Sequence, residues 1–185
     1  MYGAPQHLPI DERHPLNPIS SYGVVKVAIE NYLRMYEANQ DFRATIIRPS
    51  NPYGPGQDLS GQIGAVTTFL RAAFKEEPIT IWGDGTVVRD YIFISDLVSL
   101  LLLAVESQFS GVFNCGSGVG TSLIDLIDAV ERASGRQLST QFEPARAFDP
   151  SQVILDVSSA SRTFGWRPAM TLAQGIDLTI AKMLK

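Results

Sequence analysis

The sequence has little cysteine, no surplus of positive charge and no long apolar run, and each lack excludes a class of protein. Cys115 is the only cysteine among 185 residues, so the chain has no internal disulfide framework and fits a reducing cytoplasm. The formal net charge is −4, so no basic surface indicates nucleic acid or an anionic membrane as a partner. The longest apolar stretch, residues 97–105, is too short to cross a bilayer, and residues 1–15 lack the layout of a secretory signal.

What the chain does contain is an alternation of strand-like and helix-like segments. Apolar residues make up 45% and charged residues 18%, as in globular proteins. Periodicity predicts helices over 20–39, about 63–76, 95–106 with Ser95 as the cap, and 122–134, followed by two helices at the C-terminal end. Strands are predicted at 44–48, 79–82, 90–94, 111–115, near 138–143 and at 153–157. This alternation predicts an α/β fold, and the absence of repeats or a long linker predicts one continuous unit over 1–185.

Tyr22 and Lys26 are four residues apart near the start of the first predicted helix, and therefore share one face of it. A nearby ammonium favours the charged form of a phenol, which can then act as a general base. The alternative is an ordinary helix with a half-buried tyrosine and a solvated lysine. The spacing alone leaves both interpretations open.

The segment NCGSGVGT, residues 114–121, resembles a dinucleotide-binding loop between a strand and a helix. Its glycines are spaced GxGxG, and Thr121 stands where the third glycine of GxGxxG is needed. Three glycines also let a strand turn tightly into a helix. We favour this structural interpretation.

Six segments in order resemble the extended short-chain dehydrogenase/reductases of the NAD-dependent epimerase/dehydratase family, and among these the UDP-sugar 4-epimerases. They are YG (2–3), NPISSYGVVK (17–26), IIRPSNPYGPGQ (46–57), IWGDGTVVRDYIFISDLV (81–98), FNCGSGVGTSLIDL (113–126) and FGWRPAMTLAQGI (164–176). The resemblance covers almost the whole chain. It implies the C-terminal part of a Rossmann-type parallel sheet with a small substrate-binding α/β lobe.

The resemblance implies NAD as the cofactor and assigns roles to residues at its site. Tyr22 would be the catalytic base, and Lys26 would hold the nicotinamide ribose while favouring the phenolate. Pro49 and Ser50 would lie beside the cofactor. Asn51 would bind the sugar or the diphosphate, although such a residue also commonly caps its own turn.

Further residues match the family's nucleotide-binding positions. Arg89 and Arg146 would contact the diphosphate of a UDP-sugar, a task that suits a guanidinium fork, and Asp149 would bind the uridine ribose. Singly, each arginine would more often be a surface charge, but as a pair in matching motifs they are better candidates for the site. Val153 falls where some 4-epimerases carry a bulky tyrosine, so the resemblance implies room for an N-acetyl group and UDP-N-acetylglucosamine as a substrate beside UDP-glucose. A core tyrosine and a helix cap explain Tyr91 and Asp96 as well as a site role does.

The implied reaction is the reversible inversion of C4 in a UDP-hexose, with NAD taking and returning the C4 hydride. We expect no metal site. A nucleotide-sugar 4,6-dehydratase and a non-catalytic UDP-sugar-binding remnant remain the alternatives. The first needs an acidic pair just before the YG segment, and the second would carry Tyr22 and Lys26 without using them.

The family begins with a strand–GxxGxxG–helix unit for the NAD pyrophosphate, and a Ser or Thr precedes the YG segment. Only Met1 stands before Tyr2 here. We therefore expect residues 1–185 to be the C-terminal portion of a longer enzyme, with an unpaired sheet edge. A homodimer is the partner arrangement that the resemblance implies, built on the helix of Tyr22 and the helix at 63–76, unless their apolar faces belong to one core.

Overall fold

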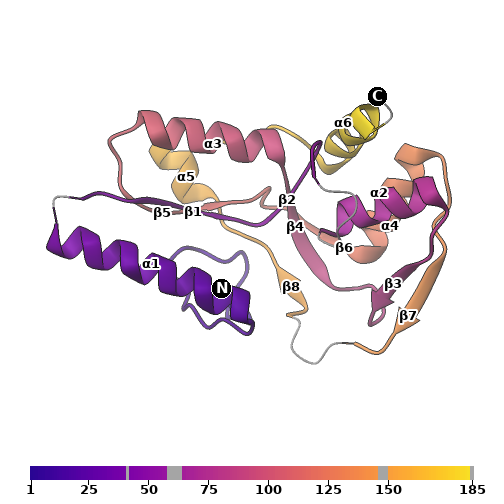
Figure 1. Ribbon diagram of the computed structural model, residues 1–185, viewed down its shortest axis with the longest axis horizontal. Coiled ribbons are helices and arrows are strands. Elements are labelled where there is room, and N and C mark those ends of the chain that lie inside the picture. The colour runs from indigo at the N-terminus through magenta and orange to yellow at the C-terminus, as the bar shows by residue number, and fades with distance from the viewer. Residues whose placement is uncertain (41, 58–63, 146–149, 184–185) are drawn as a thin grey trace.

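A parallel pair of strands forms the centre of one lobe. The computed structural model describes residues 1–40, 42–57, 64–145 and 150–183. β1 (Thr45–Pro49) pairs in parallel with β5 (Gly111–Cys115). α1 (Ser21–Asn39) lies on one side of this pair, and α3 (Ile94–Glu106) and α5 (Ser158–Phe164) lie on the other (Figure 1). Helices on both faces of parallel strands are the layering expected of an α/β fold.

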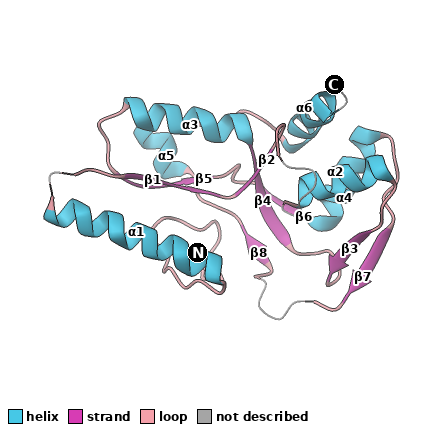
Figure 2. Cartoon of the chain, in the orientation of Figure 1, coloured by secondary structure: helices cyan, strands magenta, loops and turns pink. Residues whose placement is uncertain are grey.

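A second lobe is built around another parallel pair, β3 (Ile79–Trp82) and β7 (Thr140–Glu143). Three helices belong to it: α2 (Ala65–Lys75), α4 (Leu123–Ser134) and α6 (Leu172–Met183) (Figure 2). α4 begins with a capping box, in which the Ser122 hydroxyl accepts from the Asp125 amide and the Asp125 carboxylate accepts from the Ser122 amide. This reciprocal cap explains why the helix starts where the sequence predicts.

The strand β4 (Val88–Phe93) joins the two lobes. It pairs in parallel with β2 (Asn51–Tyr53) and β8 (Gln152–Val153), and antiparallel with β6 (Gly120–Ser122). Segments far apart in the sequence are therefore held within one small mixed sheet at the centre of the molecule (Figure 1).

Each lobe has its own apolar core. The core of the second lobe includes the fully buried Leu70, Leu126 and Ile176, and that of the first includes Ile92 and Leu100. Burying each such side chain stabilises the fold by about 1.5–3 kcal/mol. Parallel strand pairs alternating with helices along the chain confirm the predicted α/β fold.

Most element predictions match the structure, and the differences have local causes. Ser95 does not cap α3, which begins one residue earlier at Ile94 with Phe93 as its cap. β2 and β6 were not predicted because they are short and lie within segments dominated by proline and glycine. The apolar face of α2 packs into the core of the second lobe, where Phe69 is buried. Of the two helices considered for a homodimer, α2 therefore uses its apolar face within the chain's own core.

α1 differs from the other long helices because only Gly23 and Glu30 of its 19 residues are buried. Its exposed side carries a set of large apolar side chains: Tyr22, Val24, Val25, Ile29, Tyr32, Met35 and Tyr36. Large apolar side chains are thus gathered on one helix and not scattered singly over the surface.

Among the described residues, no helix combines the length and the apolar character needed to cross a membrane.

Candidate functional site

A cavity of about 410 Å³ lies where several segments of the chain meet. It is lined by residues 1–3, by Ile19 and Ser20 just before α1, by residues 48–51 at the end of β1, by Arg89 of β4, and by residues within 150–155. Five residues singled out from the sequence line it together: Pro49, Ser50, Asn51, Arg89 and Val153. The carboxyl ends of parallel strands are where α/β folds bind ligands, and β1 ends at this cavity.

Hydrogen bonds to one residue of β4 fix the turn after β1. The Ser50 hydroxyl donates to Asp90 Oδ1 at 3.3 Å, and the Asn51 side-chain amide donates to the Asp90 carbonyl at 3.0 Å. Asn51 therefore does not cap its own turn through this amide. Its side chain is instead tied to β4, at the border between the two lobes.

The first turn of α1 borders the same cavity. Ser20, which lines the cavity, is the N-cap, and its hydroxyl accepts from the Gly23 amide at 3.2 Å. Tyr22 follows two residues later and is 71% exposed, and the Lys26 ammonium lies 5.2 Å from the centroid of its ring. In the described part of the chain, Lys26 forms no ion pair with a carboxylate. The predicted proximity of phenol and ammonium is present in the structure, although neither side chain lines the cavity itself.

A second cavity, of about 390 Å³, adjoins the first. Asn51 and Arg89 line both cavities, and Trp82, Phe69 and Tyr91 are part of the wall of the second. Burial raises the pKa of Tyr91 to about 12. The phenol of Tyr91 therefore stays protonated, and this residue belongs to the wall of the cavity.

Arg89 has a fixed position between the two cavities. Its Nη1 donates to the carbonyls of Val88 at 2.8 Å and Pro150 at 2.9 Å, and the residue pairs with Val153 across β4 and β8. The sequence prediction pairs Arg89 with Arg146 and Asp149. Those two residues lie outside the described part of the chain, so their placement stays a prediction.

The glycine-rich loop serves a buried carboxylate in the structure. Asp90 is fully buried, and its carboxylate accepts from the amides of Ser117 at 2.7 Å and Gly118 at 3.2 Å. A side chain at Gly116 would collide with this carboxylate. The amides that a dinucleotide-binding loop would offer to phosphate are therefore already used, which supports the structural interpretation of the loop.

Sequence reasoning missed a buried polar network beside the cavity. Arg48 and Glu30 form a two-pronged ion pair, with Nε–Oε1 at 2.9 Å and Nη2–Oε2 at 2.6 Å. Arg48 Nη1 also donates to the Tyr2 hydroxyl at 2.8 Å, and that hydroxyl donates to Asn114 Oδ1 at 2.6 Å. The sequence feature that could have indicated this network is a charged residue, Arg48, within an otherwise apolar strand, together with Glu30 one turn after Lys26.

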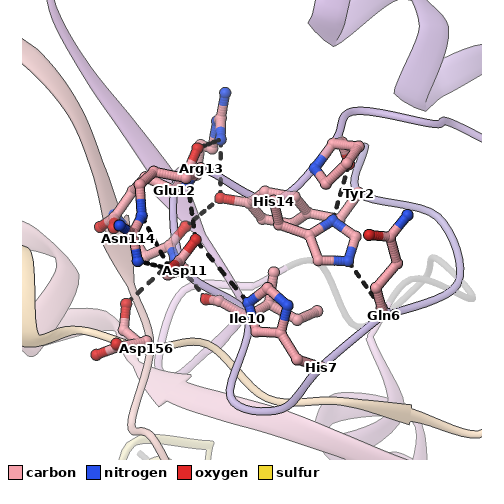
Figure 3. A network of polar contacts seen from close by, with 12 residues as sticks. Tyr2, Gln6, His7, Ile10, Asp11, Glu12, Arg13, His14, Asn114 and Asp156 are labelled. Carbon is pink, nitrogen blue, oxygen red and sulfur yellow. Dashed lines mark hydrogen bonds and ion pairs between the residues drawn. The ribbon is translucent and has the colours of Figure 1, made fainter.

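The N-terminal segment completes the network on its other side. The Glu12 carboxylate accepts from the Asn114 amide at 2.8 Å, and the Asn114 side chain donates to the carbonyls of Ile10 and Asp156 (Figure 3). The ring of His14 lies edge-on to that of Tyr2, with centroids 5.6 Å apart (Figure 3). Residues 1–14 are thereby attached to β5 and to the segment after β8.

Asp96 has a structural position. It is buried in the first turn of α3, and its Oδ2 accepts from the amides of Ala169 and Met170 at 3.1 and 3.0 Å. Within the described ranges, no group of three or more His, Cys, Asp or Glu side chains is arranged to hold a metal ion.

Residues 1–116 match the family described as the NAD dependent epimerase/dehydratase family. The chain is 39% identical over 181 residues to the UDP-glucose 4-epimerase of Mycolicibacterium smegmatis, covering 97% of this chain and 58% of that protein. It is 36% identical over 173 residues to the dTDP-4-dehydro-6-deoxyglucose reductase of Escherichia coli, covering 93% of this chain and 55% of that protein. The chain thus spans little more than half the length of these relatives.

Among solved structures, the fold is similar to that of the UDP-glucose 4-epimerase of Thermotoga maritima with UDP-glucose. The TM-score is 0.94 at 34% identity, over 99% of this chain and 60% of that one. The UDP-glucose 4-epimerase of Thermus thermophilus in complex with NAD gives a TM-score of 0.91 at 32% identity, over 99% of this chain and 60% of that one.

Proposed function

The chain belongs to the NAD dependent epimerase/dehydratase family, and from this premise we propose that it forms the sugar-nucleotide-binding part of a UDP-hexose 4-epimerase. The observation that carries the proposal is that Asn51 and Arg89 line both cavities. A diphosphate held at this border would place a nucleoside in one cavity and a sugar in the other. The sugar cavity is the one bordered by the first turn of α1.

In this proposal, Tyr22 and Lys26 carry the proton chemistry. The phenolate of Tyr22 accepts the proton of the 4-hydroxyl as the C4–O4 bond becomes a carbonyl, and returns it when the other epimer forms. The Lys26 ammonium lies 5.2 Å from the ring centroid, on the same side of α1 as the phenol. Both side chains are exposed and therefore accessible to a ligand.

The described residues fit the nicotinamide end of NAD. The Tyr22 hydroxyl and the Lys26 ammonium are groups suited to a ribose diol, and Ser50 brings a hydroxyl to the cavity wall beside Pro49. NAD, when bound, supplies a reversible acceptor for the hydride of C4. The pyrophosphate is not assigned to the glycine loop at 116–120, because Asp90 occupies amides of that loop.

The nucleotide would be held by the border residues. Arg89 is suited to the diphosphate because a guanidinium matches phosphate oxygens in shape and charge. Arg146 and Asp149 complete this part of the proposal as a second diphosphate ligand and a ribose ligand. Val153, the neighbour of Arg89 across β4 and β8, lines the sugar cavity, and its small side chain supports UDP-N-acetylglucosamine as a substrate beside UDP-glucose.

We also propose that activity needs a further part of a longer enzyme, which would supply the remaining NAD contacts. One observation supports this: β1 pairs only with β5 in the described chain, so its other edge is open. The large apolar side chains that α1 exposes, such as Tyr32 and Tyr36, form the surface that we propose for a homodimer. We propose a cytoplasmic location, which suits a chain with a single, buried cysteine.

Binding of the nucleotide tests the first half of the proposal. We expect UDP to bind the 185-residue chain, and Arg89→Gln to weaken binding about tenfold or more because a charge-assisted contact is lost. Arg162→Gln, at an exposed position on α5, is the matched control and should leave affinity unchanged. Equal affinity for UDP in both variants, measured by calorimetry, would remove Arg89 from the site.

Proton NMR of UDP-glucose or UDP-N-acetylglucosamine with NAD tests the second half. We expect no C4 epimer with the chain alone. The epimer should form after addition of the part of the Mycolicibacterium smegmatis relative that this chain does not match. Turnover by the chain alone would refute the need for a further part. Folded components that bind UDP but yield no epimer, and release no NAD on denaturation, would favour the non-catalytic interpretation.

A further inference from the structure

We propose that Glu30 and Arg48 are positioning residues for the Tyr22–Lys26 pair: their buried ion pair sets where the start of α1 stands relative to the end of β1. This inference rests on the proposed function for its catalytic meaning. Its structural half, that the pair holds the helix, stands on the contacts alone.

The first reason is that α1 is attached to the rest of the chain at few points. Glu30 is the only side chain longer than glycine's that is buried in this helix. Its carboxylate meets Arg48 through two hydrogen bonds, at 2.9 and 2.6 Å, and both side chains are no more than 5% exposed. At the far end of α1, the Glu37 carboxylate accepts from the Ala44 amide at 2.8 Å. Gly23, in the first turn, lies against Met1 and Pro18, so Glu30 is the side chain of α1 that joins this part of the helix to β1.

The second reason is the shape of the contact. A planar guanidinium that meets a carboxylate through two parallel bonds resists rotation as well as displacement. Tyr22, Lys26 and Glu30 are spaced four residues apart, so they lie close to one another on the surface of α1. Any rotation of the helix about its axis would move the phenol and the ammonium together with the carboxylate.

The third reason is where Arg48 lies on β1. It immediately precedes Pro49 and Ser50, which line the cavity, and it lines the cavity itself. Arg48 is held in turn by the Tyr2 hydroxyl at 2.8 Å. Burial opposes the charge on Arg48, but the hydrogen bonds with Glu30 and Tyr2 outweigh it, and the pKa of Arg48 lies above its usual value. The same ion pair therefore links the helix of the proposed base to the strand beside the proposed cofactor position.

Arg34 provides a matched control. Its guanidinium approaches the same Glu30 carboxylate at 3.9 Å, but from an exposed position on α1 itself, so it cannot attach the helix to β1. Arg48→Lys keeps the buried positive charge and loses the two-pronged geometry, whereas Arg34→Lys makes the same change without touching the attachment. A double variant, Glu30→Met with Arg48→Met, removes both charges together and so leaves no unpaired buried ion.

The first measurement is independent of catalysis. Spin labels at Val24→Cys on α1 and Glu106→Cys on α3, both exposed positions, report the distance between the start of α1 and the opposite layer by pulsed electron resonance. The buried Cys115 is not accessible to the label. We expect a narrow distance distribution for the native chain and Arg34→Lys, and a broader or displaced one for Arg48→Lys and the double variant. Distributions as narrow as the native one in both Arg48 variants would overturn the inference.

The second measurement separates positioning from simple structural support. In the enzyme that shows epimerisation, we expect Arg48→Lys to lower kcat about 10- to 100-fold with KM for the UDP-sugar changed less than twofold, because an error of about 1 Å at the reacting atoms costs about 100-fold. An unchanged kcat in a variant whose helix has moved would also overturn the inference. If the native enzyme forms no epimer, the proposed function fails, and the distance measurement still decides whether the ion pair holds the helix. Should Arg48→Lys not fold, the double variant takes its place in both measurements.

Discussion

The buried carboxylate of Asp90 offers the sharpest test of how the centre of the molecule is held together. Five hydrogen bonds converge on it: from the Ser50 hydroxyl, the Ser117 amide and hydroxyl, and the Gly118 and Leu155 amides. In the described chain, no lysine or arginine forms an ion pair with it, so these donors alone stabilise its charge. Asp90→Asn keeps the shape of the side chain and changes only its hydrogen-bonding capacity.

The size of the effect follows from the arrangement of the donors. Oδ1 accepts from Ser50 and from both groups of Ser117, whereas Oδ2 accepts from the amides of Gly118 and Leu155, each at 3.2 Å. If the amide oxygen of Asn takes the Oδ1 position, its NH₂ group faces those two N–H donors. The buried amide of Leu155 then loses its acceptor at about 1–3 kcal/mol, the amide of the exposed Gly118 loses its acceptor at a smaller cost, and the bonds that remain lose their ionic partner. We expect the free energy of unfolding to fall by about 2–4 kcal/mol.

Urea unfolding followed by circular dichroism measures this change. Asp128→Asn, on the exposed face of α4, is the control and should change the free energy of unfolding by no more than about 0.5 kcal/mol. A loss below about 1 kcal/mol for Asp90→Asn, with an unchanged dependence on urea, would refute the account of Asp90 as the centre of this network.

Three further predictions concern packing and titration. Gly175→Ala should lower stability by about 1–3 kcal/mol despite the better helix propensity of alanine, because the new methyl group would collide with the Tyr53 hydroxyl. Thermal unfolding measures this loss, and Ala173→Gly, at an exposed position on α6, is the comparison: there alanine should be the more stable residue, whereas at position 175 glycine should be. Burial raises the pKa of Cys115 from 9.0 to about 12, so iodoacetamide at pH 8 should modify the unfolded chain and leave the folded chain unmodified. Burial of Cys115 and Tyr91 also makes the free energy of unfolding fall with rising pH. Above pH 9 the unfolded chain loses the Cys115 proton that the folded chain keeps, and above pH 10 it loses the Tyr91 proton as well. Urea titrations between pH 8 and 11 should show a loss of about 1.4 kcal/mol per pH unit for each group, and a stability that does not change with pH would contradict this prediction.

The sequence was most informative where local patterns decide the structure. The Ser122 cap, the α1 periodicity and the β-branched run at β1 gave elements within a residue or two of their observed bounds. Five residues that line the first cavity (Pro49, Ser50, Asn51, Arg89 and Val153) were singled out from the motifs of the family resemblance. Their roles in binding and catalysis remain predictions, as do those of Arg146 and Asp149.

The sequence was least informative about partners that are distant along the chain. Nothing in the local pattern around Arg48 says that its partner is Glu30, 18 residues earlier, or that the Tyr2 hydroxyl lies on its other side. Asp90 looked like one residue of a strand motif, and its donors come from residues 27 to 65 positions later as well as from Ser50. Such contacts depend on the order and register of the strands, which local propensity does not encode.

By itself, the sequence determined the α/β class, the shared helix face of Tyr22 and Lys26, and the family, because these follow from periodicity, spacing and the order of motifs along the chain. Only the tertiary structure decided that the glycine-rich loop wraps a carboxylate, that Asn51 and Arg89 stand between two cavities, and that one buried ion pair connects α1 to β1. The physical reason is that a buried polar group must find its partner in space, and the pairing of strands far apart in the sequence determines which partner that is.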